Sequence, residues 1–184
     1  MRSIQDGLKR GLKGDTGVNW ARPESIHLTL KFLGEIDPER VGGIAAELEG
    51  AGMSRPGFTV SAGGVGGFPN LKTPRVIWVG IEQSPELKGL HSDIDERLGN
   101  IGFEREERGF TPHLTLCRIK SMADSRALGR LASDIKAEKM LDFKADSFIL
   151  FESRLGPKGA AHTAVRTFPL RGGTENAYQA TEKP

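Results

Sequence analysis

The sequence contains a single cysteine, Cys117, among its 184 residues. A disulfide within the chain is therefore impossible, and a reducing cytoplasm is the expected compartment. The apolar runs are too short to cross a membrane. The N-terminal stretch MRSIQDGLKRGLKGD also lacks the apolar core of a signal peptide. These absences predict a cytoplasmic protein with no membrane segment.

Strong charge of either sign is also missing. The chain has 26 Lys and Arg residues against 24 Asp and Glu residues, a formal net charge of +2. This balance does not by itself indicate nucleic-acid binding, although it leaves room for a small basic cleft. The glycine-rich stretch AGGVGGF is not followed by a Lys-Ser/Thr pair, which excludes a phosphate loop of the nucleotide-binding kind.

Hydrophobic periodicity predicts alternating helices and strands. The spacing of apolar residues and the Gly, Pro and Asp positions between them delimit each element. We expect helices over 2–12, 37–52, 84–102 and 125–137, and strands over 18–21, 26–33, 58–68, 75–81, 110–120, 143–155 and 164–170. This order predicts an α+β fold in which helices pack on antiparallel sheets.

One tetrapeptide occurs twice. The residues HLTL stand at 27–30 and again 86 positions later at 113–116, although the chain has only four histidines. The order strand, helix, strand, strand, helix, strand also occurs once and then roughly again. An internal duplication of this kind predicts two similar lobes related by a pseudo-two-fold axis, with a cleft between them. We expect one bilobal domain over 1–170 and a disordered tail over 171–184.

The alternation within the first repeat places its polar side chains on one face. His27 and Thr29 fall on the side opposite Leu28 and Leu30, and the second repeat places His113 with its threonine in the same way. If the lobes face each other, the cleft receives two imidazoles and two hydroxyls.

After the second repeat, the alternation of polar and apolar residues along the strand is out of step. Strict alternation would turn Arg118 toward the dry face and Ile119 toward the histidine face. A bulge of one residue near Cys117 would correct both positions. Arg118 would then join His113 and Thr115, where its guanidinium could clamp a phosphate.

Two histidines across a cleft suit concerted acid–base chemistry. Imidazole titrates near neutral pH, so one ring can be neutral while the other is protonated. The neutral ring takes a proton from water and the charged ring gives a proton to a leaving oxygen. The hydroxyls of Thr29 and Thr115 can hold anionic oxygens between the rings. An in-line displacement at phosphorus needs this arrangement, without a metal, a cofactor or a nucleophilic side chain.

Other interpretations of the same residues remain open at this stage. A zinc site could use His27, His113 and Cys117, but no paired-ligand spacing supports it. Cys117 could also act as a nucleophile. We expect His91 to be packed or on the surface, and His162 to be solvated.

The two HLTL segments and their surroundings resemble a known family. The stretches NWARPESIHLTLKFLGEI, RVIWVGI, FTPHLTLCRI and FILFESRLGPKGA occur in family order. The sequence resembles the 2H phosphoesterases, and within them the RNA 2′,3′-cyclic phosphodiesterases, also called 2′-5′ RNA ligases. The resemblance covers residues 3–170.

This resemblance implies roles for the motif residues. The substrate would be an RNA end with a 2′,3′-cyclic phosphate, opened to a 2′-phosphate. His27 would donate a proton to the departing 3′ oxygen, and His113 would accept one from water. Thr29, Thr115 and Arg118 would hold the phosphate. No metal or cofactor is implied, and the same site could run backwards to join RNA ends.

Lys31, Phe68 and Arg154 complete the residues expected to bind substrate. Phe68 could stack on a base. Family members usually begin with an apolar strand before the first helix. Here MRS leads almost directly into that helix, so we expect one strand of the first lobe to be missing and a sheet edge to be exposed.

Two alternatives to this function stay open. The chain could be a catalytically weakened protein that binds RNA ends, or a cyclic phosphodiesterase acting on a nucleotide or an ADP-ribose derivative. We expect a monomer in each case.

Overall fold

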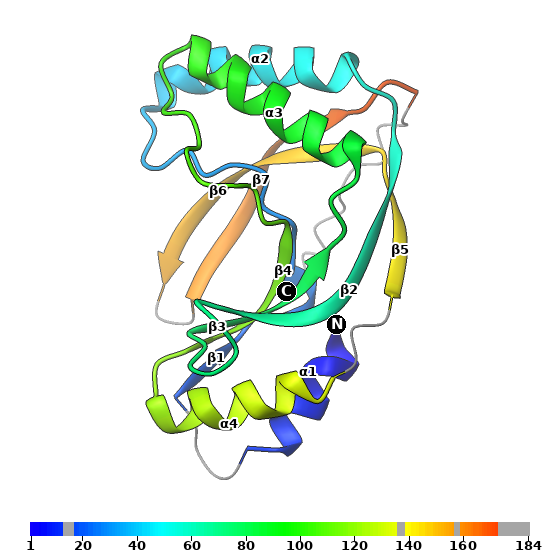
Figure 1. Cartoon of the computed structure of the whole chain (residues 1–184). Coiled ribbons are helices and arrows are strands. Elements are labelled where there is room, and N and C mark those ends of the chain that lie inside the picture. The colour runs from blue at the N-terminus through cyan, green and yellow to red at the C-terminus, as the bar shows by residue number, and fades with distance from the viewer. Residues whose placement is uncertain (13–16, 136–138, 157–158, 173–184) are drawn as a thin grey trace, which may run out of the picture. The chain divides into compact units, whose positions relative to one another are not determined.

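The computed structural model describes residues 1–12, 17–135, 139–156 and 159–172 (Figure 1). Its helices and antiparallel strands form an α+β fold, as the sequence predicted. The chain divides into two compact units, and each is built from three separate segments. Unit 1 contains Met1–Leu30, Ser61–Gln83 and Thr111–Asp142, and unit 2 contains Lys31–Val60, Ser84–Phe110 and Phe143–Pro184.

Unit 1 contains most of a five-stranded sheet. The strand order is β1 (Val18–Trp20), β4 (His113–Ile119), β3 (Val76–Ile81), β2 (Phe58–Phe68) and β5 (Lys139–Ala145). Only the first residues of β2 and the last residues of β5 belong to unit 2. The pairs β1–β4, β3–β4 and β2–β3 are antiparallel. The carboxyl-terminal strand that the sequence predicted as one piece over 143–155 is divided between β5 and a later strand, because Asp146 interrupts it.

Two helices pack beside each other in unit 1, namely α1 (Arg2–Arg10) and α4 (Met122–Ser133) (Figure 1). Ser121 caps α4 by accepting a hydrogen bond from the Asp124 N–H. Helix α4 packs on β3 and β4, so the apolar side chains of these strands are buried. Leu116, Cys117 and Leu128 are among those that are fully buried.

Gln5 is a buried polar residue of α1 that the apolar spacing did not reveal. Its side-chain amide donates to the carbonyl oxygens of Ala21 (2.7 Å) and Leu116 (3.0 Å). The Leu116 carbonyl also accepts from the Ala21 N–H (2.9 Å). Gln5 therefore ties α1 to β4 and to the segment that follows β1.

Unit 2 pairs the helices α2 (Val41–Met53) and α3 (Pro85–Asn100), which lie side by side in Figure 1. Helix α2 also packs on the antiparallel hairpin of β6 (Ser147–Gly156) and β7 (Gly159–Pro169). A short 3-10 turn, η2 (Pro38–Arg40), precedes α2, and the Asp37 carboxylate caps it. The helix predicted over 84–102 is confirmed as α3, and the four apolar residues that form a stripe along it are all buried: Leu87, Leu90, Ile94 and Leu98.

The strand predicted over 26–33 is wrong. Only Leu28 makes a β-bridge there, to Leu114. A 3-10 turn, η1 (Pro23–Ser25), interrupts the ladder just before it. After Leu30 the chain passes into unit 2, where Phe32 is 80% exposed instead of lying on a dry face. Polar and apolar side chains do alternate in the sequence of this segment, but its backbone lacks the row of hydrogen-bonded partners that defines a strand.

Among the helices that the structure describes, none combines the length and the apolar composition needed to span a bilayer. Most of the tail predicted to be disordered, residues 173–184, lies outside the described residues.

Candidate active site

The two HLTL motifs lie side by side in unit 1. The chain from β1 onward runs antiparallel along one edge of β4. Asn19 pairs with Arg118, the Ala21 N–H bonds to the Leu116 carbonyl, and Leu28 bridges Leu114. This register sets His27 beside Thr115 and Thr29 beside His113, because neighbouring positions of antiparallel segments alternate together.

Both histidine rings are held in the same way. The Nδ1 atom of His27 lies 2.9 Å from the carbonyl oxygen of Ser25, and that of His113 lies 2.7 Å from the carbonyl oxygen of Thr111. A carbonyl oxygen only accepts hydrogen bonds, so each Nδ1 must carry the proton. The acid–base chemistry of each ring therefore falls to its Nε2 atom.

The predicted bulge in β4 is present. Cys117 is opposite Ile77, whereas the next position of β3, Trp78, is opposite Thr115, so Leu116 is the extra residue. Arg118 is exposed and Ile119 is buried, as the parity argument required. His113, Thr115 and Arg118 thus occupy successive positions on one face of β4, opposite Gly80, Trp78 and Val76 of β3.

Two aromatic rings surround the His113 imidazole. Phe68 meets it edge to face at 5.0 Å between ring centroids, and Trp78 lies at 6.0 Å. The two aromatic rings also contact each other, at 5.2 Å. Phe68 was predicted at the site, but Trp78 was not. Its position as the cross-strand partner of a motif threonine is visible only once the bulge and the register are known.

The Trp78 ring fits here because Gly66 lies under it. These two residues pair across β2 and β3, and a Cβ atom at position 66 would run into the indole ring. The glycine in this strand is therefore a site where a side chain approaches the backbone closely.

We expect Gly66→Ala to displace Trp78, and with it the packing around His113. The free energy of unfolding should fall by about 1–3 kcal/mol, because overpacking destabilises a protein core by this amount. Gly43→Ala is the matched control, because Gly43 lies in α2 with open space at its Cβ position. It should raise stability by roughly 1 kcal/mol. Chemical denaturation of both variants measures the difference, and equal effects would contradict the packing role.

Cys117 takes no part in this face of the sheet. It is fully buried, and burial raises the pKa of its thiol to about 12. A protonated, buried thiol is a poor nucleophile at neutral pH. Among the described residues, no group of three or more His, Cys, Asp or Glu side chains could hold a metal ion. Both alternatives that the sequence left open for this residue are therefore excluded.

Lys31 lies in unit 2, where its ammonium group is already engaged. It is hydrogen-bonded to the Asp95 carboxylate and to the carbonyl oxygen of Glu104 (2.8 Å). Its side chain is only 6% exposed. This environment does not fit the substrate-binding role that the sequence suggested, since a substrate anion could not reach the ammonium group.

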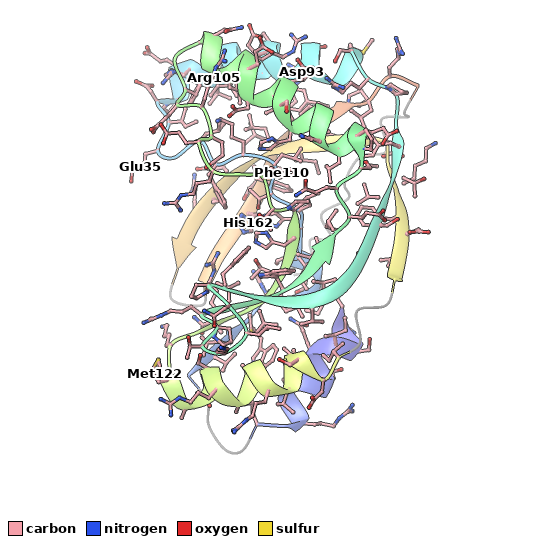
Figure 2. All side chains as sticks on the ribbon, viewed as in Figure 1. Glu35, Asp93, Arg105, Phe110, Met122 and His162 are labelled. Carbon is pink, nitrogen blue, oxygen red and sulfur yellow. The ribbon has the colours of Figure 1, made fainter. Side chains whose placement is uncertain are left out.

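Arg154 and His162 belong to the β6–β7 hairpin of unit 2, and Figure 2 labels His162. Arg154 is exposed and pairs with Glu152 at 2.9 Å. The His162 Nδ1 atom lies 2.7 Å from the Ser153 hydroxyl.

His91 is packed, as expected from its place beside the helical stripe. Its ring stacks on Phe110, which follows α3 and its loop (Figure 2), at 4.0 Å between centroids. Burial lowers the pKa of His91 more than the nearby Asp95 carboxylate raises it. An imidazole that stacks on Phe110 within unit 2 is a packing residue.

The sequence matches the family described as LigT like phosphoesterase twice, over residues 1–78 and 79–162. Each match contains one of the two motifs. Two similar relatives carry the name RNA 2′,3′-cyclic phosphodiesterase. The one from Archaeoglobus fulgidus is 33% identical over 90% of this chain and 93% of its own length, and the one from Thermotoga maritima is 32% identical over 92% and 87%.

Solved structures agree with these matches. A crystal structure of a Thermus thermophilus protein has a TM-score of 0.68 at 26% identity, covering 93% of both chains. The E. coli LigT structure in its apo form also has a TM-score of 0.68, at 24% identity, over 93% of this chain and 92% of its own. The second likeness concerns the fold alone. Because the family model matches both halves of the chain and the relatives are similar over most of their length, the chain belongs to the LigT like phosphoesterase family.

Proposed function

We propose that this protein hydrolyses RNA 2′,3′-cyclic phosphate ends to 2′-phosphomonoesters. The observation that carries the proposal is the pair of matched histidines on adjacent segments of unit 1. Each has its Nδ1 atom bound to the backbone carbonyl two residues earlier. The names of the relatives support the choice of substrate.

The proposed reaction needs one proton at each histidine. The neutral His113 Nε2 removes a proton from water as the water oxygen attacks phosphorus. The bond from phosphorus to the 3′ oxygen breaks, and the protonated His27 Nε2 gives its proton to that oxygen. The product carries a 2′-phosphate and a free 3′-hydroxyl. A pair of this kind is worth roughly 10²–10⁴-fold in rate for each group.

The remaining motif residues stabilise negative charge. The hydroxyls of Thr29 and Thr115 lie next to the imidazoles in the register and donate to the phosphate oxygens. Arg118, one position farther along the same face of β4, adds a guanidinium that neutralises the developing charge. The same groups can use the 5′-hydroxyl of a second RNA end in place of water. His113 then takes the proton of that hydroxyl, the 5′ oxygen attacks phosphorus, and the 3′ oxygen leaves with the proton of His27, so the two ends are joined through a 2′-5′ bond.

Turnover of a cyclic-phosphate RNA in excess EDTA tests this proposal. We expect the purified protein to release a phosphomonoester end, and we expect Thr115→Val to reduce the rate while the protein stays folded. Binding without turnover would favour the alternative of a weakened RNA-end binding protein. Turnover of a cyclic phosphate on a mononucleotide or on an ADP-ribose derivative, with no turnover of RNA, would favour the other alternative.

A further inference from the structure

The two units carry opposite net charge, although the chain as a whole is nearly balanced. Unit 1 has 13 Lys and Arg residues against 8 Asp and Glu residues, a formal charge of +5. Unit 2 has 13 against 16, a formal charge of −3. The positive excess therefore belongs to the unit that holds both motif histidines, which favours a polyanionic ligand there.

The face of β4 that carries the motif residues continues beyond Arg118. Lys120 is the next residue of the same parity, and it is exposed. Its backbone is fixed, because its N–H donates to the Gly17 carbonyl oxygen (2.8 Å). Alternate residues of a strand are about 7 Å apart. Lys120 thus lies one such step past Arg118, on the side away from His113.

Asn19 lies beside this row. It is exposed on β1 and pairs directly with Arg118, so the two side chains share a face. Arg118 in turn pairs with Val76, and Val76 with Phe68, whose ring touches His113. A cross-strand row therefore connects Asn19 to the histidine site.

The cations of this row are not neutralised within the described part of the chain. Arg118 and Lys120 form no ion pair with a described carboxylate. Asp124, four residues after Lys120, instead accepts a hydrogen bond from the Gly17 N–H (2.9 Å). Two exposed cations one step apart with an amide beside them match the spacing and charge of successive phosphates in an extended strand.

We propose that Lys120 and Asn19 form a subsite for the phosphodiester that precedes the cyclic end. This inference rests on the proposed function and deepens it. The reacting phosphate lies at the histidines and Arg118, and the preceding RNA backbone follows β4 toward Lys120. The enzyme would then prefer an RNA strand over a mononucleotide, which lacks this second phosphate.

The test compares two substrates in the full-length protein. One is an RNA oligomer with a 2′,3′-cyclic end, and the other is a nucleoside 2′,3′-cyclic monophosphate. We expect Lys120→Gln to lower kcat/KM for the oligomer by roughly three- to tenfold at low salt. The slope of log kcat/KM against log salt should become less steep by about 0.7. The value for the mononucleotide should stay unchanged within about twofold, since it makes no contact there.

Lys88→Gln is the matched control, because Lys88 is an exposed lysine on α3 of unit 2. Lys88→Gln should leave kcat/KM unchanged for both substrates. The subsite would be overturned if Lys120→Gln lowered kcat/KM equally for the oligomer and the mononucleotide. It would also be overturned if this variant lowered kcat/KM for neither.

A binding measurement keeps the inference separate from the proposed chemistry. The probe is a fluorescent RNA oligomer ending in a 2′-phosphate, titrated with wild type, Lys120→Gln and Asn19→Ala. Weaker binding and a smaller salt slope in both variants, even if wild type hydrolyses neither substrate, would support the subsite while removing the proposed function. Unchanged affinity in both variants would overturn the subsite whatever the activity.

Discussion

Replacing either motif histidine with asparagine should lower kcat/KM by roughly 10²–10⁴-fold, the usual worth of one acid–base group. Asparagine is the informative replacement, because its side-chain nitrogen is as many bonds from Cβ as the histidine Nδ1. His27→Asn can therefore still donate to the Ser25 carbonyl, and His113→Asn to the Thr111 carbonyl. Both variants keep this donor but lose the rest of the ring, including the Nε2 atom that carries the proposed acid–base chemistry.

Two measurements separate chemistry from folding in these variants. Thermal unfolding should show the wild-type transition within a few degrees. Binding of an RNA oligomer ending in a 2′-phosphate should be largely retained. His91→Asn serves as a control on an imidazole outside the motifs, and it should keep near-normal turnover. If His27→Asn or His113→Asn also keeps a near-normal rate, the two-histidine mechanism is wrong.

The second large effect concerns stability. Lys31→Met should lower the free energy of unfolding by about 2 kcal/mol, because it leaves the half-buried Asp95 carboxylate without its cation and its side-chain hydrogen bond. The Asp95 side chain is 15% exposed, and the Glu106 N–H is its other donor (3.1 Å). Lys31→Met/Asp95→Leu should recover much of the loss, since no half-buried carboxylate is left without a cation. Urea denaturation of the two single variants and the double variant forms the cycle.

The same pair predicts a dependence on pH. Burial raises the pKa of Asp95, but the hydrogen bonds from Lys31 and from the Glu106 N–H outweigh it, so the pKa lies below its ordinary value. The pair contributes fully to stability at a pH above the pKa of an aspartate in the unfolded chain, about 3.9. This contribution is lost as the pH falls through the lower folded value. The difference in the free energy of unfolding between wild type and Lys31→Met should therefore become smaller as the solution is acidified.

Activity distinguishes this structural role from a role in substrate binding. At a temperature where Lys31→Met remains folded, its kcat/KM should stay within about twofold of wild type. A large rise in KM with unchanged stability would restore the sequence-based interpretation of this lysine.

Local signals in the sequence predicted those parts of the fold that depend on neighbours in the chain. The helices predicted over 37–52 and 84–102 are found as α2 and α3, because apolar periodicity and capping are local properties of the chain: Asp37 caps the turn before α2, and Ser84 caps α3. The bulge at Leu116 and Cys117 was predicted as well, because Arg118 and Ile119 would otherwise have faced the wrong sides of the strand.

Features that depend on distant partners could not be predicted in this way. Residues 26–33 alternate like a strand, but η1 and the passage into unit 2 leave a single bridge at Leu28. Lys31 has the parity of His27 and Thr29, yet it belongs to another unit. Trp78 became a site residue only through its register with Thr115 and the space over Gly66.

The identity of the product tests the central claim most directly. Purified protein in EDTA is given an RNA oligomer with a 2′,3′-cyclic phosphate end, and the released end is identified by phosphorus NMR. The account predicts a 2′-phosphate and a free 3′-hydroxyl, because His27 protonates the 3′ oxygen. A 3′-phosphate would contradict the role given to His27, and the absence of any opened product would contradict the proposed activity itself.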